Sequence, residues 1–218
     1  MRSTALLTFL VVFVSTATSM AMADTDVAEL SKETIVLFSE TQKIVEDMQS
    51  SAASLLPTYL SFQGVPLSNP EYQLPNIKIE NLPTAAMDND TFLNHTDEIR
   101  LKNNLYFYSA IVEFLKTTMA EQEDLNPQSL TAKFEEAMAN SNTLISKISA
   151  IMTQMGLSVT ITFPEPLVVP YVGSAFFKKK LRGGVICKEY KERVLLTKQE
   201  FEFFAKKYHE QLVQPQEE

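Results

Sequence analysis

The sequence predicts an all-α fold, a long-chain four-helix bundle in up-up-down-down order with two long crossover loops. Four segments carry apolar residues at alternating three- and four-residue steps, the pattern of helices that pack along one side. Residues 58–96 and 157–174 are proline-rich connections, whereas only a few residues separate the second and third segments. The first helix should be on the order of 45 Å long, and only the two long connections can return the chain over that distance. The helices are therefore expected to run up, up, down, down.

The first 23 residues have the pattern of a secretory signal peptide. A positive charge precedes an apolar run over residues 5–14, and residues 21–23 offer an A-x-A cleavage site. The run is too short to span a membrane stably, and no other run is long and apolar enough for a transmembrane helix. We therefore expect a secreted, extracellular protein without membrane insertion, with its bundle domain over 24–211 and a flexible C-terminal tail over 212–218.

Each predicted helix is defined by its apolar seam. The first seam, which stops before Pro57, is Val27, Leu30, Thr34, Leu37, Thr41, Ile44, Met48, Ser51 and Leu55. The second is Leu101, Leu105, Tyr108, Val112, Leu115 and Met119. The third, which begins after Asn126-Pro127 and stops at a natural C-terminal cap, Gly156, is Leu130, Phe134, Ala137, Ser141, Leu144, Ile148, Ile151 and Met155. The fourth is Gly183, Cys187, Tyr190, Val194, Thr197, Phe201, Phe204 and Tyr208.

Two residue types in the last helix need an explanation. Cys187 is the single cysteine, so no intramolecular disulfide is possible and the fold must be held by packing. A buried small apolar residue is one interpretation of Cys187, with a reactive thiol or an intermolecular bridge as alternatives. Gly183 and Gly184 would each cost about 1 kcal/mol relative to alanine inside a helix. The pair predicts either the close approach of another element, most simply the first crossover, or a kink that re-aims the start of the helix.

Two N-glycosylation sequons lie close together in the first crossover. Asn89 and Asn94 are each followed by a threonine two residues later, so both are expected to carry glycans. Because glycans require an exposed chain in the secretory pathway, the sequons agree with the predicted signal peptide.

Charge is distributed unevenly along the chain. The net charge is −8, yet residues 175–211 hold ten Lys and Arg residues against five Asp and Glu residues. Such a dipolar molecule can be steered toward a charged partner. The secretory compartment argues against nucleic acid, and heparan sulfate stays a candidate partner.

The sequence assembles no catalytic or metal site. His95 and His209 lie in different segments, without the clustered ligands that a zinc site needs. No G-x-S-x-G motif occurs, and the five glycines form no phosphate-binding loop. We expect no cofactor, no metal and no enzymatic activity.

The stretch from Ser174 to Val194 is the most informative part of the chain. Two phenylalanines begin the last helix, and Lys178, Lys179, Lys180 and Arg182 follow in its first turns. The helix dipole disfavours cations there by about 0.3–1 kcal/mol each, so folding alone does not explain them. An aromatic knob beside basic side chains is a candidate protein contact, because aromatic residues and arginine dominate interface energetics. A solvated basic face with a phenylalanine or two in the core is the alternative.

Periodicity separates the two phenylalanines. At about 100° per residue, the seam from Gly183 to Tyr208 extends back through Phe176. Phe177 lies about a quarter-turn away, and Lys180 sits at the edge of the seam on the same side. Phe176 is therefore the expected core anchor, and Phe177 with Lys180 the expected exposed pair.

Short motifs between Leu55 and Phe204 also point to a family. In the first crossover and second helix they comprise Tyr59, Gly64, Val65, Pro66, Pro70, Leu82, Pro83, Ala85, Asp88, Arg100, Leu101 and Tyr108. Between the second and third helices lies Leu125-Asn126-Pro127, and the last helix contributes Phe177, Lys180, Gly183, Cys187, Tyr190 and Glu192. With the bundle topology and the signal peptide, they resemble the interleukin-6 superfamily of helical cytokines. The most similar branch is that of ciliary neurotrophic factor, cardiotrophin and cardiotrophin-like cytokine.

The resemblance implies receptor assembly rather than catalysis. Such cytokines, several of them neurotrophic, crosslink gp130-type and leukaemia inhibitory factor receptor-type receptors, often with an alpha receptor, and activate JAK–STAT signalling. The family's Phe-x-x-Lys motif contacts the leukaemia inhibitory factor receptor, and it matches Phe177 and Lys180 here. The chain lacks tryptophan, and Arg182 occupies a position where some relatives have one, which puts the use of an alpha receptor in question. The single cysteine argues against the disulfide-bearing branches.

A second class of function stays open from the sequence. A secreted helical bundle could bind heparin through its basic last helix, or carry an apolar ligand, without activating a receptor. It would then retain heparin in a salt-sensitive way or co-purify with a lipid, whereas a receptor ligand would lose signalling when Phe177 and Lys180 are replaced.

Overall fold

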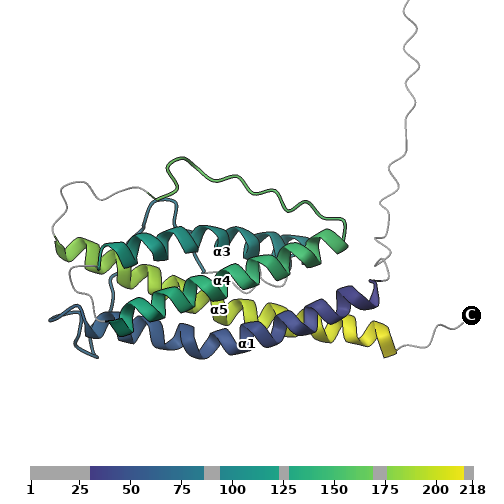
Figure 1. Ribbon diagram of the computed structural model, residues 1–218, viewed down its shortest axis with the longest axis horizontal. Coiled ribbons are helices and arrows are strands. Elements are labelled where there is room, and N and C mark those ends of the chain that lie inside the picture. Colours follow the sequence, from purple (N-terminus) through teal and green to yellow (C-terminus); the bar gives the residue numbers. More distant parts are fainter. Residues whose placement is uncertain (1–29, 86–93, 123–127, 169–175, 214–218) are drawn as a thin grey trace, which may run out of the picture.

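The protein is an all-α bundle, as predicted (Figure 1). The computed structural model describes residues 30–85, 94–122, 128–168 and 176–213, and no strand occurs among them. The helices are α1, Lys32–Ser61; α3, Asp97–Ala120; α4, Gln128–Gln154; and α5, Phe176–Val213. Among the described residues, no helix is long and apolar enough to cross a lipid bilayer. The predicted signal peptide and the sequon residue Asn89 lie outside the described residues, as does the chain beyond Val213.

Contacts between helix ends establish the up-up-down-down order. The Thr34 hydroxyl, at the start of α1, donates to Gln154 at the end of α4 over 2.8 Å, so these two helices are antiparallel. Tyr59, near the end of α1, donates to the carbonyl of Lys180 near the start of α5, which makes α1 and α5 antiparallel. Asp97 at the start of α3 binds Lys207 near the end of α5. α1 and α3 therefore run one way, and α4 and α5 run the other (Figure 1).

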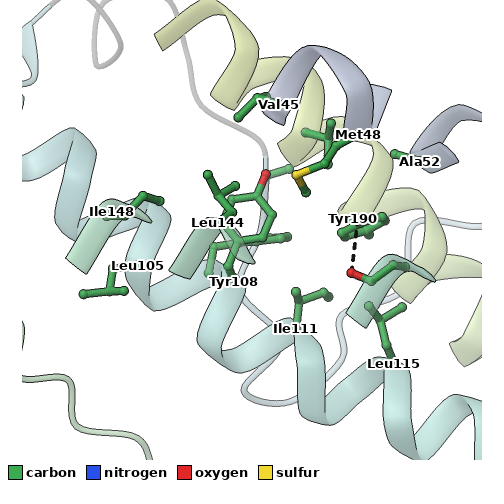
Figure 2. Close-up of a cluster of buried hydrophobic side chains, with 14 of the residues drawn as sticks. Val45, Met48, Ala52, Leu105, Tyr108, Ile111, Leu115, Leu144, Ile148 and Tyr190 are labelled. Carbon is green, nitrogen blue, oxygen red and sulfur yellow. Dashed lines mark hydrogen bonds between the residues drawn. The ribbon is translucent and has the colours of Figure 1, made fainter. Parts of the chain in front are cut away.

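The predicted seams form the core. All eight residues of the fourth seam are buried, as are all residues of the third except the partly buried Met155. The centre of the bundle draws side chains from all four helices: Val45, Met48, Leu105, Tyr108, Ile111, Leu144, Ile148 and Tyr190 (Figure 2). The Tyr190 hydroxyl donates to the carbonyl of Ala137 over 3.4 Å, so even this polar atom is satisfied inside the core.

Local capping fixes the helix boundaries. Ser31 caps α1 by accepting a hydrogen bond from the amide of Thr34 over 3.2 Å. α4 begins at Gln128 and is followed by Gly156, which has a φ of 68°. The amide of Gly156 bonds to the carbonyl of Thr153 and that of Leu157 to the carbonyl of Met152, the two bonds of a Schellman motif. The predicted start and end of this helix are confirmed.

The predicted end of the first helix is wrong. α1 continues through Pro57 to Ser61, because the residues beyond the proline are held by the core. Tyr59 is fully buried, and its ring packs edge-on against Phe134 with the centroids 6.1 Å apart. Pro57 itself is exposed, so its ring meets solvent while the helix lacks one backbone hydrogen bond there. Packing of the last turn outweighs that local cost.

The first crossover packs onto α5, where the double glycine lies. A Cβ added at Gly184 would lie 2.9 Å from the side chain of Leu74 in this crossover. One added at Gly183 would lie 2.5 Å from Cζ of Tyr59 and 2.8 Å from Thr118, on α1 and α3. Close approach is therefore confirmed at both glycines, and at Gly183 the approaching elements are helices rather than the crossover.

The two crossovers are tied to α5 and to each other. Glu189 accepts a hydrogen bond from the amide of Ala85 over 2.7 Å, which holds the end of the first crossover against α5. Ile79 of the same crossover is buried in the core. Asn81, with a φ of 61°, donates to the carbonyl of Pro166 in the second crossover over 3.2 Å.

A buried polar network joins α3 to α5. Arg193 and Glu200 form an ion pair of 3.2 Å with almost no exposure of either side chain. Asn104 donates to Glu200 over 2.6 Å and accepts from Thr197 over 2.7 Å, and Tyr108 donates to Thr197. Burial raises the pKa of Glu200 above its usual range, against the opposing effect of Arg193. This network was not predicted from the sequence.

Candidate functional site

Two neighbouring exposed aromatic side chains lie at the start of α5. Phe176 is 52% exposed and Phe177 is 43% exposed, in the first turn of the helix. The end of α1 and the start of the first crossover reach the same end of the bundle and bring Phe62 and the 89% exposed Val65. We call these four residues, Phe62, Val65, Phe176 and Phe177, the bundle-end patch.

The predicted inward position of Phe176 is wrong. Phe176 is the first residue of α5 and is more exposed than Phe177. The prediction extends the apolar seam of α5 backwards, which assumes that the core of the bundle lies beside every turn of this helix. Here the first turn of α5 projects past the packed part of the bundle, so the side that faces inward farther along meets solvent. Both phenylalanines therefore belong to the exposed surface.

Lys180 is held by the protein rather than projecting freely. Its Nζ donates to the carbonyl of Gln63 over 2.5 Å and lies 4.5 Å from the centroid of the Phe176 ring. Its own carbonyl accepts the hydroxyl of Tyr59 over 2.9 Å. Lys180 thus contacts Phe176, one turn before it, and ties α5 to the end of α1.

Tyr59 and Gly183 set the position of this first turn. The Tyr59 ring lies against the backbone of Gly183, where no side chain fits. Burial raises the pKa of Tyr59 above its usual range, and Cys187 and Glu121 add to the shift, so the hydroxyl stays protonated and serves as a donor. The aromatic knob is therefore carried on a rigid helix end, which lowers the entropy lost on binding.

The four cations at the start of α5 have different environments. Arg182 is buried and pairs with Glu121, the residue that caps the end of α3. This pair explains Arg182 in structural terms, since its charge meets a carboxylate and the negative end of the α3 dipole. Lys178 is exposed and Lys179 half-buried, and among the described residues neither has a carboxylate within ion-pair distance. The positive charge available to a partner thus comes from Lys178 and Lys179.

Asn94 is exposed directly before α3. Thr96 of the same sequon caps α3 by accepting a hydrogen bond from the amide of Ile99 over 3.3 Å. The Asn94 side chain is not needed for this cap, so a glycan and the cap can coexist. Glycosylation at Asn94 stays a prediction, and Asn89 lies outside the described residues.

Within the described residues, no group of three or more His, Cys, Asp or Glu side chains could hold a metal ion. Cys187 is free and fully buried, and burial raises the pKa of its thiol above the usual range. A thiolate is therefore disfavoured, which agrees with the interpretation of Cys187 as a core residue.

Three members of the bundle-end patch were not predicted from the sequence as exposed contact residues: Phe62, Val65 and Phe176. Phe62 and Val65 follow Pro57, where the helix was expected to have ended. Tyr59 and Val65 nevertheless match family positions, as do several residues of the last helix. This shared resemblance is the signal that could have connected the segment after Pro57 with the start of the last helix.

The chain is similar to one family model and to curated relatives. The family model described as Plethodontid receptivity factor PRF matches residues 2–212 of the chain. Cardiotrophin-2 of Mus musculus is 33% identical over 147 residues, which cover 66% of this chain and 71% of the relative. Cardiotrophin-2 of Pan troglodytes has the same identity over the same shares of both chains.

Proposed function

This chain belongs to the plethodontid receptivity factor family and to the interleukin-6 superfamily of helical cytokines, and from that premise we propose that it is a secreted receptor crosslinker. In this proposal it brings a gp130-type receptor and a leukaemia inhibitory factor receptor-type receptor together and thereby activates JAK–STAT signalling. The bundle-end patch, with Phe177 and Lys180, is the contact for the second receptor type.

One observation carries the proposal: two phenylalanines stand exposed on a helix end that buried contacts hold rigid. Exposed aromatic side chains favour association because they remove a large apolar area from water with few rotatable bonds. Their neighbours Lys178 and Lys179 add positive charge, so a partner with an apolar hollow rimmed by carboxylates is complementary.

Lys180 has a positioning role in this proposal. Its ammonium group is already bonded to Gln63 and lies over the ring of Phe176. Replacing Lys180 therefore acts on the receptor contact partly by releasing Phe176. Phe176 joins Phe177 as a proposed contact residue.

The alternative of a heparin-binding bundle has less support. Lys188 lies 3.8 Å from Glu192 and Lys198 lies 3.6 Å from Glu202 along the exposed side of α5. These pairs reduce the free positive charge that a polyanion would need. Among the described residues, Lys178 and Lys179 do not take part in such pairs. Heparan sulfate therefore stays a candidate secondary partner through these two lysines.

The test is the binding of the purified chain to immobilised ectodomains of each receptor type, followed by STAT phosphorylation in cells that carry both. Phe176→Ala, Phe177→Ala and the double variant Phe177→Ala with Lys180→Ala are compared with Phe203→Ala. Phe203 is a matched control, because it is 46% exposed and lies on the same helix far from the patch.

Loss of a central aromatic contact should weaken binding to the leukaemia inhibitory factor receptor-type ectodomain by about 30-fold or more, which corresponds to about 2 kcal/mol. Helicity and thermal unfolding of the patch variants should stay close to the wild type, and Phe203→Ala should bind this ectodomain normally. A folded double variant with wild-type binding and full signalling would contradict the proposal.

A further inference from the structure

One segment of the second crossover has strand-forming residues but pairs with no strand in the part of the chain that the structure describes. Residues 158–163 read Ser-Val-Thr-Ile-Thr-Phe, and their course shows no turn or bend. Among the described residues, no backbone hydrogen bond joins 158–163 to another part of the chain. A connection that only spans a distance has no need of such residues. The mismatch between local preference and observed structure marks a candidate interaction site.

The bundle fixes one face of this segment. Ile161 packs against the core, and the ring of Phe163 lies 5.0 Å from that of Tyr106 on α3. Val159, on the same face by strand alternation, is 42% exposed. Ser158, Thr160 and Thr162 alternate with these residues and are exposed. The segment runs along the outside of α3, at the periphery of the molecule (Figure 1).

We infer that residues 158–163 pair with the same segment of a second copy of this chain, as an antiparallel two-stranded ribbon centred on Ile161. In this register Val159 of each copy lies opposite Phe163 of the other, and Thr160 lies opposite Thr162. Aliphatic–aromatic and Thr–Thr pairs are both favourable across antiparallel strands. The pairing also covers the exposed part of Val159.

Charge supports a second copy as the occupant. The chain has a net charge of −8, which opposes self-association in general. Residues 157–164 contain no charged side chain, so this edge lets two copies approach without placing like charges opposite each other. Natural proteins usually guard an exposed edge with lysine or proline, and here the first proline comes only at Pro164.

The size of the contact sets its strength. A single pair of short strands buries less than the roughly 1,200 Å² of a stable protein–protein interface, so the dimer should be weak and concentration-dependent. The segment lies along the side of the bundle, apart from the bundle-end patch. The dimer and receptor binding through the patch are therefore independent, and either can fail without the other.

The test is sedimentation-velocity centrifugation of the full mature chain between about 5 µM and about 500 µM, a range that brackets weak association. Thr160→Lys with Thr162→Lys places lysines opposite each other in the proposed register and should abolish the dimer. Thr160→Lys with Thr162→Glu places each lysine opposite a glutamate of the other copy and should keep or strengthen it. Thr153→Lys with Gln199→Lys, at exposed helical positions, controls for added charge.

A wild-type dimer that the double-lysine variant loses, while the lysine–glutamate variant and the control keep it, supports the inference. A wild-type chain that stays monomeric throughout overturns it. A dimer that survives in the double-lysine variant also overturns it, since the contact then lies elsewhere. Loss of the dimer in the lysine–glutamate variant rejects the antiparallel register. Circular dichroism checks that each variant is folded.

Discussion

Two adjacent glycines in α5 give the sharpest test of how the start of this helix is held. At Gly183, a new Cβ would lie 2.5 Å from Cζ of the buried Tyr59 ring and 2.8 Å from Thr118. At Gly184, the closest atom is a methyl carbon of Leu74, at 2.9 Å, at the free end of a side chain in the crossover. Gly183→Ala and Gly184→Ala therefore make the same chemical change against a rigid neighbour and against a movable one.

The expected changes in the free energy of unfolding are large enough to distinguish Gly183→Ala from Gly184→Ala. Each substitution gains about 1 kcal/mol from helix propensity. Overpacking a rigid core costs about 1–3 kcal/mol or more, and the very short distances at Gly183 place it at the upper end of that range. Gly183→Ala should thus lower the free energy of unfolding by about 2 kcal/mol, whereas Gly184→Ala should stay within about 0.5 kcal/mol of the wild type, because a rotation of Leu74 costs about what propensity gains.

Urea unfolding followed by circular dichroism measures both values, and the thermal midpoint of Gly183→Ala should fall by roughly 4–8 °C for a chain of this size. Gly183→Ala should also weaken binding at the bundle-end patch, because the shifted Tyr59 ring carries the hydroxyl that holds Lys180. If Gly183→Ala is as stable as Gly184→Ala, the Tyr59 ring does not limit this position and the account of a rigid helix end is refuted.

Three further predictions concern other parts of the fold. Pro57→Ala should raise the free energy of unfolding by about 1–3 kcal/mol in urea titrations, because it restores a backbone hydrogen bond in α1 at an exposed position; an unchanged midpoint would contradict this. In a secretory host, Asn94→Gln and Thr96→Ala should both remove one glycan by mass, Thr96→Ser should keep it, and only Thr96→Ala should also lose about 1 kcal/mol through the missing cap of α3. Glu200 has a pKa raised by burial, so its folded form binds a proton more readily than its unfolded form; lowering the pH toward 4.5 should raise the stability of the wild type relative to Glu200→Gln, and a constant difference across that range would show that Glu200 is not the responsible group.

The helices could be predicted from the sequence because their seams are long and their ends carry local signals. Apolar spacing located every residue of the fourth seam, and Gly156 identified a Schellman motif that depends on one positive φ value. Topology followed from geometry alone, since a short link cannot return the chain along a helix. Each of these features depends on residues near one another in sequence or on chain length.

The errors arise where tertiary contacts override a local rule. Pro57 does disrupt a backbone hydrogen bond, but buried Tyr59 keeps the next turn helical. Arg193 and Glu200 have the composition of a solvated helix surface, and only Asn104 on α3 shows that they face inward. Arg193 contacts Glu200 from the same helix, but the donor Asn104, which completes the network, comes from another helix and leaves no signal in the α5 sequence.

The start of α5 combines both situations and is the part of the chain where function is proposed. Periodicity correctly separates two directions around the helix, but it does not tell where the bundle ends, and Phe176 lies beyond that point. Once Phe176 is exposed, Lys180 is the residue one turn away that contacts it, and the Tyr59 hydroxyl fixes Lys180 in turn. A sequence match to Phe-x-x-Lys treats phenylalanine and lysine as two equal contacts. The structure instead separates two exposed phenylalanines from a lysine that lies against the Phe176 ring, and this difference is why replacing Lys180 and replacing Phe177 should affect binding by different routes.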